Sequence, residues 1–239
     1  MLEAVLFDLD GTLLHMDTDE FTTEYIRALA PHLEHVVAPH IFAKQLMAST
    51  YEMIKNTDPS RTNQEIFIAD FFARIGQPVE SLMPIFDDFY RHDFAKLKRL
   101  TRPNPWAQSV VDQAIRNGWR VVIATNPVFP LEAIAERLRW AGIDQYSYDL
   151  ITSYEVMHYC KPQPAYYQEI LRKLQLKPEQ CLMVGNDVDE DLVAGCLGIK
   201  TFLAEECVIN RRGEPPKADY VGSFCDLIDL LDRIRSHGE

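Results

Sequence analysis

Two patterns of hydrophobic and polar positions divide the chain. From about residue 17 to about residue 100, apolar residues recur at helical spacing, three or four residues apart. From about residue 101 onward, helical patterns alternate with short apolar runs that are rich in β-branched residues. This alternation predicts a parallel sheet with helices packed on both of its faces.

The first pattern predicts four helices. Asp17 and Glu20 have the spacing of a capping box and begin the first helix, whose apolar row is broken at Pro31. Thr62 and Glu65 have the same spacing ahead of the third helix, which ends at Gly76. The apolar faces of the four helices are Phe21, Tyr25, Leu29 and Leu33; Phe42, Leu46 and Met53; Ile68, Phe71, Phe72 and Ile75; and Met83, Phe86, Phe89 and Tyr90.

The second pattern predicts the elements of the sheet. The segment from Ala4 to Phe7 is an apolar run of the same kind, so we place it in that sheet. The helical block, residues 17–100, is then an insertion after the first strand, and the α/β domain consists of residues 1–16 and 101–239. The other predicted strands cover residues 119–124, 150–151, 181–184 and 201–203, and the predicted helices cover residues 106–117, 131–140, 165–174 and 192–197.

Composition is that of a soluble globular protein. With 239 residues, 47% hydrophobic and 25% charged, the chain can bury a substantial core. A formal net charge of −12 without a basic cluster argues against nucleic-acid binding, and no apolar run approaches the roughly 20 residues that span a bilayer. Five scattered cysteines favour reduced thiols, and residues 1–14 do not resemble a signal peptide. We expect a cytoplasmic protein with no nucleic-acid or membrane partner; its oligomeric state is left open.

The most informative segment is Asp8-Leu9-Asp10-Gly11-Thr12, where the first apolar run ends. Side chains alternate along a strand, so Asp8 and Asp10 leave its end on the same side. Two carboxylates this close repel each other unless a cation or a shared proton lies between them. An EF-hand calcium loop is excluded, because the required glycine is missing from its sixth position and a strand precedes the segment. The segment predicts a metal site, a proton-transfer pair or both, with a solvated turn as the alternative.

Three later segments place further polar residues at predicted strand ends. Thr125-Asn126 follows the strand over residues 119–124, Lys161 precedes the helix over residues 165–174, and an acidic stretch from Gly185 to Asp191 follows the strand over residues 181–184. In parallel α/β sheets, ligands bind beyond the carboxyl ends of the strands. Each segment alone is explained as a turn, a solvated lysine or an acidic helix start. Their order along the chain favours one shared site.

In these four segments the chain resembles the haloacid dehalogenase superfamily of aspartate-nucleophile hydrolases. The resemblance implies a Rossmann-like parallel sheet core and identifies residues 17–100 as an inserted helical C1 cap of the four-helix type, with hinges near His15-Met16 and Arg102-Pro103. It implies that Asp8 is the nucleophile and Asp10 the general acid and base. The implied phosphate contacts are Gly11, Thr12, Thr125, Asn126 and Lys161, and the implied Mg²⁺ ligands are Asp8, the backbone carbonyl of Asp10 and Asp187.

One segment departs from the pattern of the superfamily. Many members have Gly-Asp directly after the fourth strand, where this chain has Gly185-Asn186-Asp187. We expect Asp187 to supply the metal carboxylate and Asn186 to add a neutral oxygen. Asp191 is the alternative ligand, or a partner of Lys161.

The resemblance implies a Mg²⁺-dependent phosphatase that hydrolyses a small phosphorylated metabolite through an aspartyl-phosphate intermediate. A phosphomutase uses the same core and stays open, as does a catalytically silent binding protein. A 2-haloacid dehalogenase needs neither a metal nor a second acid, so Asp10 and the acidic segment at residues 185–191 disfavour it. The aromatic-rich insertion is explained by its own helix packing and therefore indicates no substrate.

Overall fold

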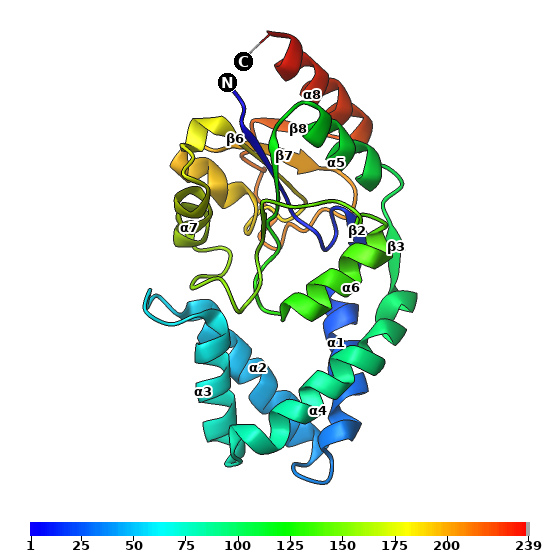
Figure 1. Cartoon of the computed structure of the whole chain (residues 1–239), viewed down its shortest axis with the longest axis vertical. Helices are drawn as coiled ribbons and strands as arrows, with labels where there is room; N and C mark the ends of the chain where they lie inside the picture. The colour runs from blue at the N-terminus through cyan, green and yellow to red at the C-terminus, as the bar shows by residue number, and fades with distance from the viewer. Residues whose placement is uncertain (238–239) are drawn as a thin grey trace.

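A six-stranded parallel sheet forms the centre of the larger part of the molecule (Figure 1). The computed structural model describes residues 1–237. The strand order is β5-β4-β1-β6-β7-β8, so the first strand lies in the middle, with later strands added on both sides. The predicted α/β class is confirmed. The strands are β1 Ala4–Phe7, β4 Arg120–Ile123, β5 Leu150–Ile151, β6 Cys181–Gly185, β7 Lys200–Ala204 and β8 Tyr220–Gly222.

Helices cover both faces of the sheet. Alternate residues of a strand point to opposite faces, and here both sets are apolar, so both faces need a covering layer. Val5 and Phe7 of β1 belong to the apolar cluster that includes residues of α5 and α8, whereas Ala4 and Leu6 belong to the cluster that includes residues of α7. Figure 1 shows α7 on one side of the sheet and α5 and α8 on the other. The helices of this part are α5 Ala107–Arg116, α6 Leu131–Ala141, α7 Pro164–Leu174 and α8 Phe224–His237.

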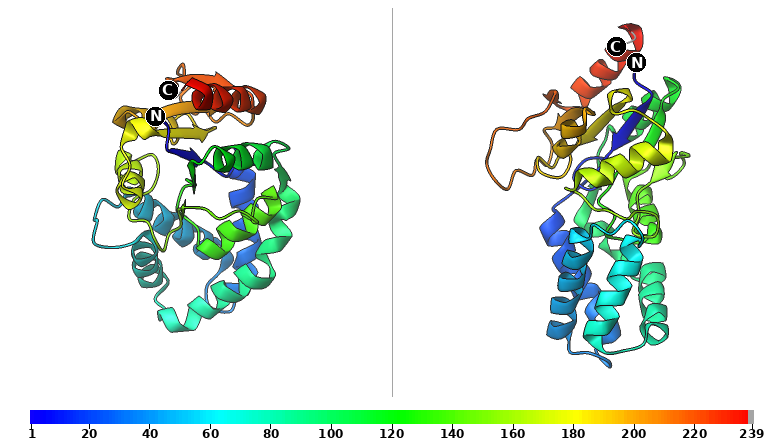
Figure 2. Two further views of the ribbon diagram at one scale, coloured as in Figure 1. Left: turned by 45° about the horizontal axis from the view of Figure 1, so that its top comes forward. Right: turned by 90° about the vertical axis from the view of Figure 1, so that its left-hand side faces the viewer.

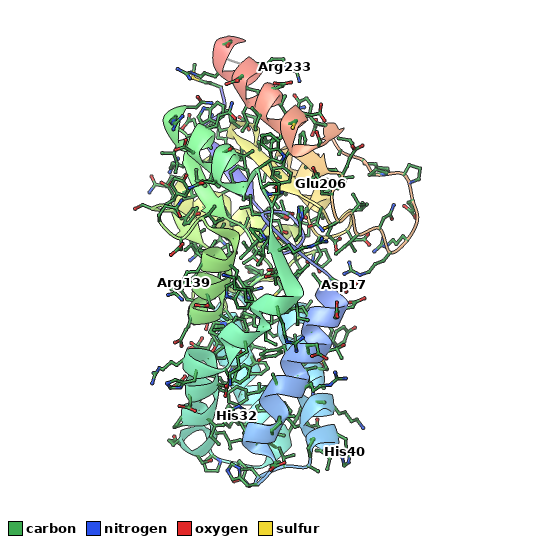
Figure 3. All side chains as sticks on the ribbon, turned by 90° about the vertical axis from the view of Figure 1, so that its right-hand side faces the viewer. Asp17, His32, His40, Arg139, Glu206 and Arg233 are labelled. Carbon is green, nitrogen blue, oxygen red and sulfur yellow. The ribbon has the colours of Figure 1, made fainter. Side chains whose placement is uncertain are left out.

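The insertion forms a helical cap at the opposite end of the molecule from both termini (Figures 1 and 2). Figure 3 labels Asp17 where the first cap helix begins beside the core, and His32 and His40 at the far end of the cap. All four predicted helices are present, and the break at Pro31 is confirmed by a 3-10 turn, Ala30–Leu33. The cap helices are α1 Thr18–Leu29, α2 Pro39–Lys55, α3 Asn63–Ile75 and α4 Val79–His92, followed by a 3-10 segment, Phe94–Leu100.

Aromatic rings join the cap to the core. Phe94, at the end of the cap, stacks on Trp140 of α6 with ring centroids 5.4 Å apart. Phe21 and Tyr25 of α1 contact Phe129, which lies just before α6, in edge-to-face geometry. Such pairs contribute about 0.5–1.5 kcal/mol each beyond their burial. The cap is therefore held to the core by packed side chains as well as by its two chain connections.

The two chain connections pair with each other. Strand β2, Leu14–Met16, and strand β3, Thr101–Pro103, form an antiparallel ribbon in which His15 lies opposite Arg102. These are the two segments predicted as hinges, and the ribbon brings them side by side between core and cap (Figure 1). The division into domains at residues 16/17 and 100/101 stays a prediction.

Several local predictions need correction. Residues 192–197 form a 3-10 helix rather than an α-helix. The capping box at Thr62 and Glu65 is complete, but in the first cap helix only the Asp17 half forms, its carboxylate accepting the N–H groups of Asp19 and Glu20. Strands β2, β3 and β8 and helix α8 were not predicted. Among the residues that the structure describes, no helix is long and apolar enough to cross a membrane.

Protonation of His15 is disfavoured in the folded protein. Its ring lies in β2 with Nε2 buried and without a hydrogen-bond partner. Burial lowers the pKa of His15 below its ordinary value of 6.5, while Glu206 opposes this shift and Arg102 adds to it. The folded protein then binds fewer protons here than the unfolded chain does, so stability falls as the pH falls below about 6.5.

We expect His15→Gln to reduce the loss of thermal stability between about pH 7.5 and about pH 5.5, because glutamine does not titrate in this range. Melting temperatures of wild type and variant at both pH values measure the effect. His35→Gln, at an exposed position in the loop before α2, is the matched control. If the melting temperatures of His15→Gln and of the wild type fell by the same amount between the two pH values, His15 would not be a source of the acid sensitivity.

Candidate active site

The predicted site residues converge at one edge of the sheet. The N–H of Asp8 donates to the carbonyl of Val184 at 2.9 Å, and the N–H of Ala124 donates to the carbonyl of Phe7 at 2.7 Å. These bonds align the carboxyl ends of β4, β1 and β6. The segments that follow the three strands therefore begin side by side, as the order of the polar segments predicted.

A buried lysine lies between two carboxylates. Lys161 Nζ donates to Asp8 Oδ1 at 2.8 Å and to Asp191 Oδ1 at 2.6 Å, and the lysine is only 1% exposed. Burial alone would lower the pKa of Lys161, but Asp191 and Asp8 outweigh it and hold that pKa well above its usual value. Asp191 Oδ2 accepts the backbone N–H of Asp187 at 2.9 Å, which fixes the far side of the network. Asp191 was predicted either as an alternative metal ligand or as a partner of Lys161, and the contact with Lys161 is observed.

Thr12 contacts the second oxygen of Asp8, and Asn186 in turn contacts Thr12. Thr12 Oγ1 lies 3.0 Å from Asp8 Oδ2 and 2.8 Å from Asn186 Oδ1, and Thr12 is fully buried. Asn186 Nδ2 donates in turn to the carbonyl of Cys207 at 2.7 Å. Gly11 has a φ of +90°, and a Cβ there would lie 2.3 Å from Asn186 Nδ2. Glycine is therefore required at this turn for both backbone and space.

Asp10 is paired with an arginine that sequence reasoning did not single out. Its Oδ2 forms an ion pair with Arg137 Nη1 of α6, and Arg137 is 1% exposed with its guanidinium 4.7 Å from the centre of the Phe129 ring. Asp10 Oδ1 and Arg137 Nη2 are both buried without a hydrogen-bond partner. Burial raises the pKa of Asp10, with Arg137 opposing the shift and Asp8 adding to it. Asp10 thus has one fixed oxygen and one free oxygen.

Buried hydrogen bonds fix the backbone of the segment that follows β4. The Thr125 carbonyl accepts bonds from Thr152 Oγ1 at 2.7 Å and from the Tyr166 hydroxyl at 2.9 Å. Asn126 Nδ2 donates to Glu190 Oε2 at 3.0 Å. Burial raises the pKa of Glu190. Glu190 was counted in the acidic stretch, but its contact with Asn126 was not predicted.

Asp187 is bonded through both carboxylate oxygens. Its Oδ1 accepts the N–H groups of Asp189 and Glu190, both at 2.9 Å, and its Oδ2 forms an ion pair with Arg211. Among the side chains that the structure describes, no group of three or more His, Cys, Asp or Glu is arranged to hold a metal ion. The predicted metal ligands therefore do not form a three-acid cluster among these residues, and metal binding by Asp8, Asp10 and Asp187 stays a prediction.

A cavity of about 510 Å³ lies between core and cap. Its cap end has apolar walls, including Phe21, Leu46 and Phe86. Gly11, Thr12 and Lys161 are not part of the lining, so their predicted contact with phosphate stays a prediction. The contacts of Lys161 and Thr12 with Asp8 are observed. The polar core end is lined by Asp8, Asp10, Thr125, Asn126, Asn186 and Asp187.

Arg137 and Arg211 are the cationic residues among the described cavity lining, and sequence reasoning singled out neither of them. Arg137 had a signal, because it falls in the apolar stripe of its helix beside Ala133, Ile134 and Leu138, all of which are buried. A charged residue on a buried face needs a partner, and here the partner is a site carboxylate. Arg211 lies in an irregular segment without periodicity, so no comparable signal was available.

Known proteins resemble this chain over nearly its whole length. A curated relative from Bacillus cereus (strain ATCC 10987 / NRS 248), named pyrophosphatase PpaX, is 27% identical over 234 residues, which is 96% of each chain. A crystal structure of a HAD phosphatase from Thermococcus onnurineus covers 96% of this chain and 98% of its own, with a TM-score of 0.57 and 18% identity. A crystal structure of CbbY from Rhodobacter sphaeroides in complex with phosphate covers 97% of this chain and 100% of its own, with a TM-score of 0.57 and 20% identity. At these identities the two structures establish the fold alone.

Family assignment comes from a match over most of the sequence. The sequence model of the haloacid dehalogenase-like hydrolases matches residues 2–195, which include β1, the whole cap and all four polar segments. The fold described above is also that of solved members. The chain therefore belongs to the haloacid dehalogenase-like hydrolase family of enzymes.

Proposed function

We propose that the chain is a Mg²⁺-dependent phosphatase that hydrolyses a phosphomonoester through a covalent phosphate ester of Asp8. The observation that carries the proposal is the position of the Asp8 carboxylate. It follows the central strand, reaches the cavity, and is oriented by Lys161 on one oxygen and Thr12 on the other. A curated relative named as a pyrophosphatase supports phosphoryl hydrolysis as the reaction class.

In the first step, an Asp8 oxygen attacks phosphorus and the bond from phosphorus to the leaving alcohol oxygen breaks. Asp10 donates a proton to that oxygen, so the alcohol leaves neutral. In the second step, the Asp10 carboxylate takes a proton from water as the water attacks phosphorus. The bond between Asp8 and phosphorus breaks, and inorganic phosphate is released. The raised pKa of Asp10, caused first by its burial, suits a group that must carry a proton.

Arg137 positions Asp10 for this role. It holds Oδ2 and leaves Oδ1 free of any protein partner. A buried acceptor without a partner is costly, so its presence at a cavity indicates a group that acts on something entering from the cavity. Lys161 balances the charge that builds up around Asp8 and the phosphate.

The donor chemistry of the site suits Mg²⁺, which takes oxygen ligands and commonly uses only one or two carboxylates. Asp8, the Asp10 carbonyl and Asp187 would hold the ion, and it would neutralise charge on the phosphate oxygens. Asp8, Asp10, Asn186, Asp187 and Asp191 all line the same cavity. Asp191 is 1% exposed and is bonded to the equally buried Lys161, whereas the ion-pair partner of Asp187 is Arg211, whose side chain is 53% exposed. We therefore keep Asp187 as the third ligand, ahead of Asn186 and Asp191.

Hydrolysis of p-nitrophenyl phosphate with added Mg²⁺ tests the proposal. We expect EDTA to abolish phosphate release and Mg²⁺ to restore it. Asp8→Asn should remove activity by several orders of magnitude, since an amide is a poor nucleophile. Asp10→Asn should slow turnover by about 100- to 10,000-fold, because the proton transfer is lost while the nucleophile remains.

Folded variants are required for this comparison, and a melting curve of each verifies them. Near wild-type activity in Asp8→Asn would contradict the covalent mechanism. Activity that persisted after exhaustive EDTA treatment would contradict the role of the metal. Faster release of halide from a 2-haloacid than of phosphate from the aryl phosphate would favour the dehalogenase alternative.

The close approach of Gly185 to Asp191 gives a test of the buried network that Lys161 forms with Asp8 and Asp191. A Cβ on Gly185 would lie 2.1 Å from Asp191 Oδ2 and 2.3 Å from its Cγ, so Asp191 must move. We expect Gly185→Ala to lower the free energy of unfolding by about 1–3 kcal/mol through overpacking. Displacement of Asp191 also shifts Lys161 and Asp8, so activity should fall by about 100-fold.

Gly195→Ala is the matched control, because its Cβ would have only an ordinary contact at 3.7 Å, with Thr201 Cγ2. Both variants are compared by chemical denaturation and by phosphatase assay. Equal behaviour of the two would mean that the position of Asp191 is not important for stability or for catalysis.

A further inference from the structure

The cavity is divided into a polar end and an apolar end. The cap wall presents Phe21, Ile26, Leu46, Phe72, Met83 and Phe86 to the same space that Asp8 and Asp10 reach from the core. A cavity of about 510 Å³ holds roughly 17 waters at about 30 Å³ each, far more space than a phosphate group fills.

The hydroxyl groups of four cap-wall residues already have hydrogen-bond partners within the cap. The hydroxyls of Tyr25 and Tyr90 bond to each other at 2.8 Å. Burial raises the pKa of both tyrosines, so both hydroxyls stay neutral. The hydroxyls of Thr22 and Thr50 bond back to carbonyls of their own helices, at 2.8 and 2.9 Å. The wall therefore offers a ligand mainly hydrocarbon and ring surface.

The charges around the cavity disfavour a second anionic group. Among the cavity-lining residues that the structure describes, the only cationic ones are Arg137 and Arg211, both from the core and both paired with carboxylates. On the cap side, the charged lining residues are Asp19 and Asp87. A carboxylate or second phosphate at the cap end would lose water and meet like charge without a cation.

We infer that this site takes a phosphomonoester of a bulky apolar alcohol, with no charge other than its phosphate. The phosphate is directed to Asp8, and the hydrocarbon part of the alcohol fills the cap end. This inference rests on the proposed phosphatase function and specifies its substrate class. It separates the chain from an enzyme for pyrophosphate or for small metabolites with two anionic groups.

A homologous series of n-alkyl phosphates, from ethyl to hexyl, tests the inference. The alcohols leave with nearly the same acidity, so differences in kcat/KM report contact with the cap wall. Each buried methylene is worth about 0.8 kcal/mol, so we expect kcat/KM to rise about two- to fourfold per methylene. Pyrophosphate and 2-phosphoglycolate should be hydrolysed less efficiently than hexyl phosphate.

Met47→Lys places a cation in the wall and provides the matched variant test. Met47 lines the cavity from α2 and is 47% exposed, so the substitution is compatible with folding. We expect it to reduce the dependence on chain length and to improve the relative efficiency with 2-phosphoglycolate by about tenfold. Ile41→Lys, on the same helix, 43% exposed and outside the cavity lining, should leave both properties unchanged.

Binding of non-hydrolysable phosphonates separates this inference from the proposed function. By titration calorimetry, hexylphosphonate should bind at least about tenfold more tightly than methylphosphonate. If no phosphate ester is hydrolysed but this difference is found, the phosphatase proposal fails and the apolar ligand class stands. A flat response to chain length in both assays, or a preference for 2-phosphoglycolate or pyrophosphate over hexyl phosphate, would overturn the inference.

Discussion

The buried contact of Lys161 with Asp8 and Asp191 is the interaction on which the rest of the site depends. An ammonium group in the interior is tolerated only when carboxylates and hydrogen bonds replace its water. The three residues come from distant parts of the chain and meet only if the segments that follow β1 and β6 lie beside the one before α7. Removal of one partner from such a network costs about 3–5 kcal/mol, so the same contact links the fold to the site.

The insertion after β1 gives the core and the cap different roles at the cavity. The core holds the carboxylates in fixed positions through buried bonds, while the cap supplies apolar walls that take no part in those bonds. The β2–β3 ribbon and the aromatic contacts of Phe94 with Trp140 keep the two parts together over the cavity. In the proposed enzyme, reaction chemistry and choice of leaving group can therefore change independently.

The sequence predicted the sheet, the cap helices and the polar strand ends, because strong periodicity and the Asp8-Leu9-Asp10 spacing depend on local order alone. It did not predict the three-residue strands β2, β3 and β8, which are too short to show alternation and, unlike Leu150-Ile151 of β5, are not apolar throughout. The pairing of Arg137 with Asp10 depends on tertiary contact across 127 residues of sequence. The aromatic cap residues were explained by helix packing, but several of them also line the cavity.

The most direct test of the central claim is to trap phosphate on Asp8. Enzyme turning over p-nitrophenyl phosphate is quenched and treated with borohydride, which reduces an aspartyl-phosphate to homoserine. Peptide mass spectrometry then locates the change. The account predicts homoserine at position 8, dependent on substrate and absent from Asp8→Asn. Reduction at another carboxylate, or no reduction at position 8 in enzyme that releases p-nitrophenol in a burst before steady turnover, would contradict it.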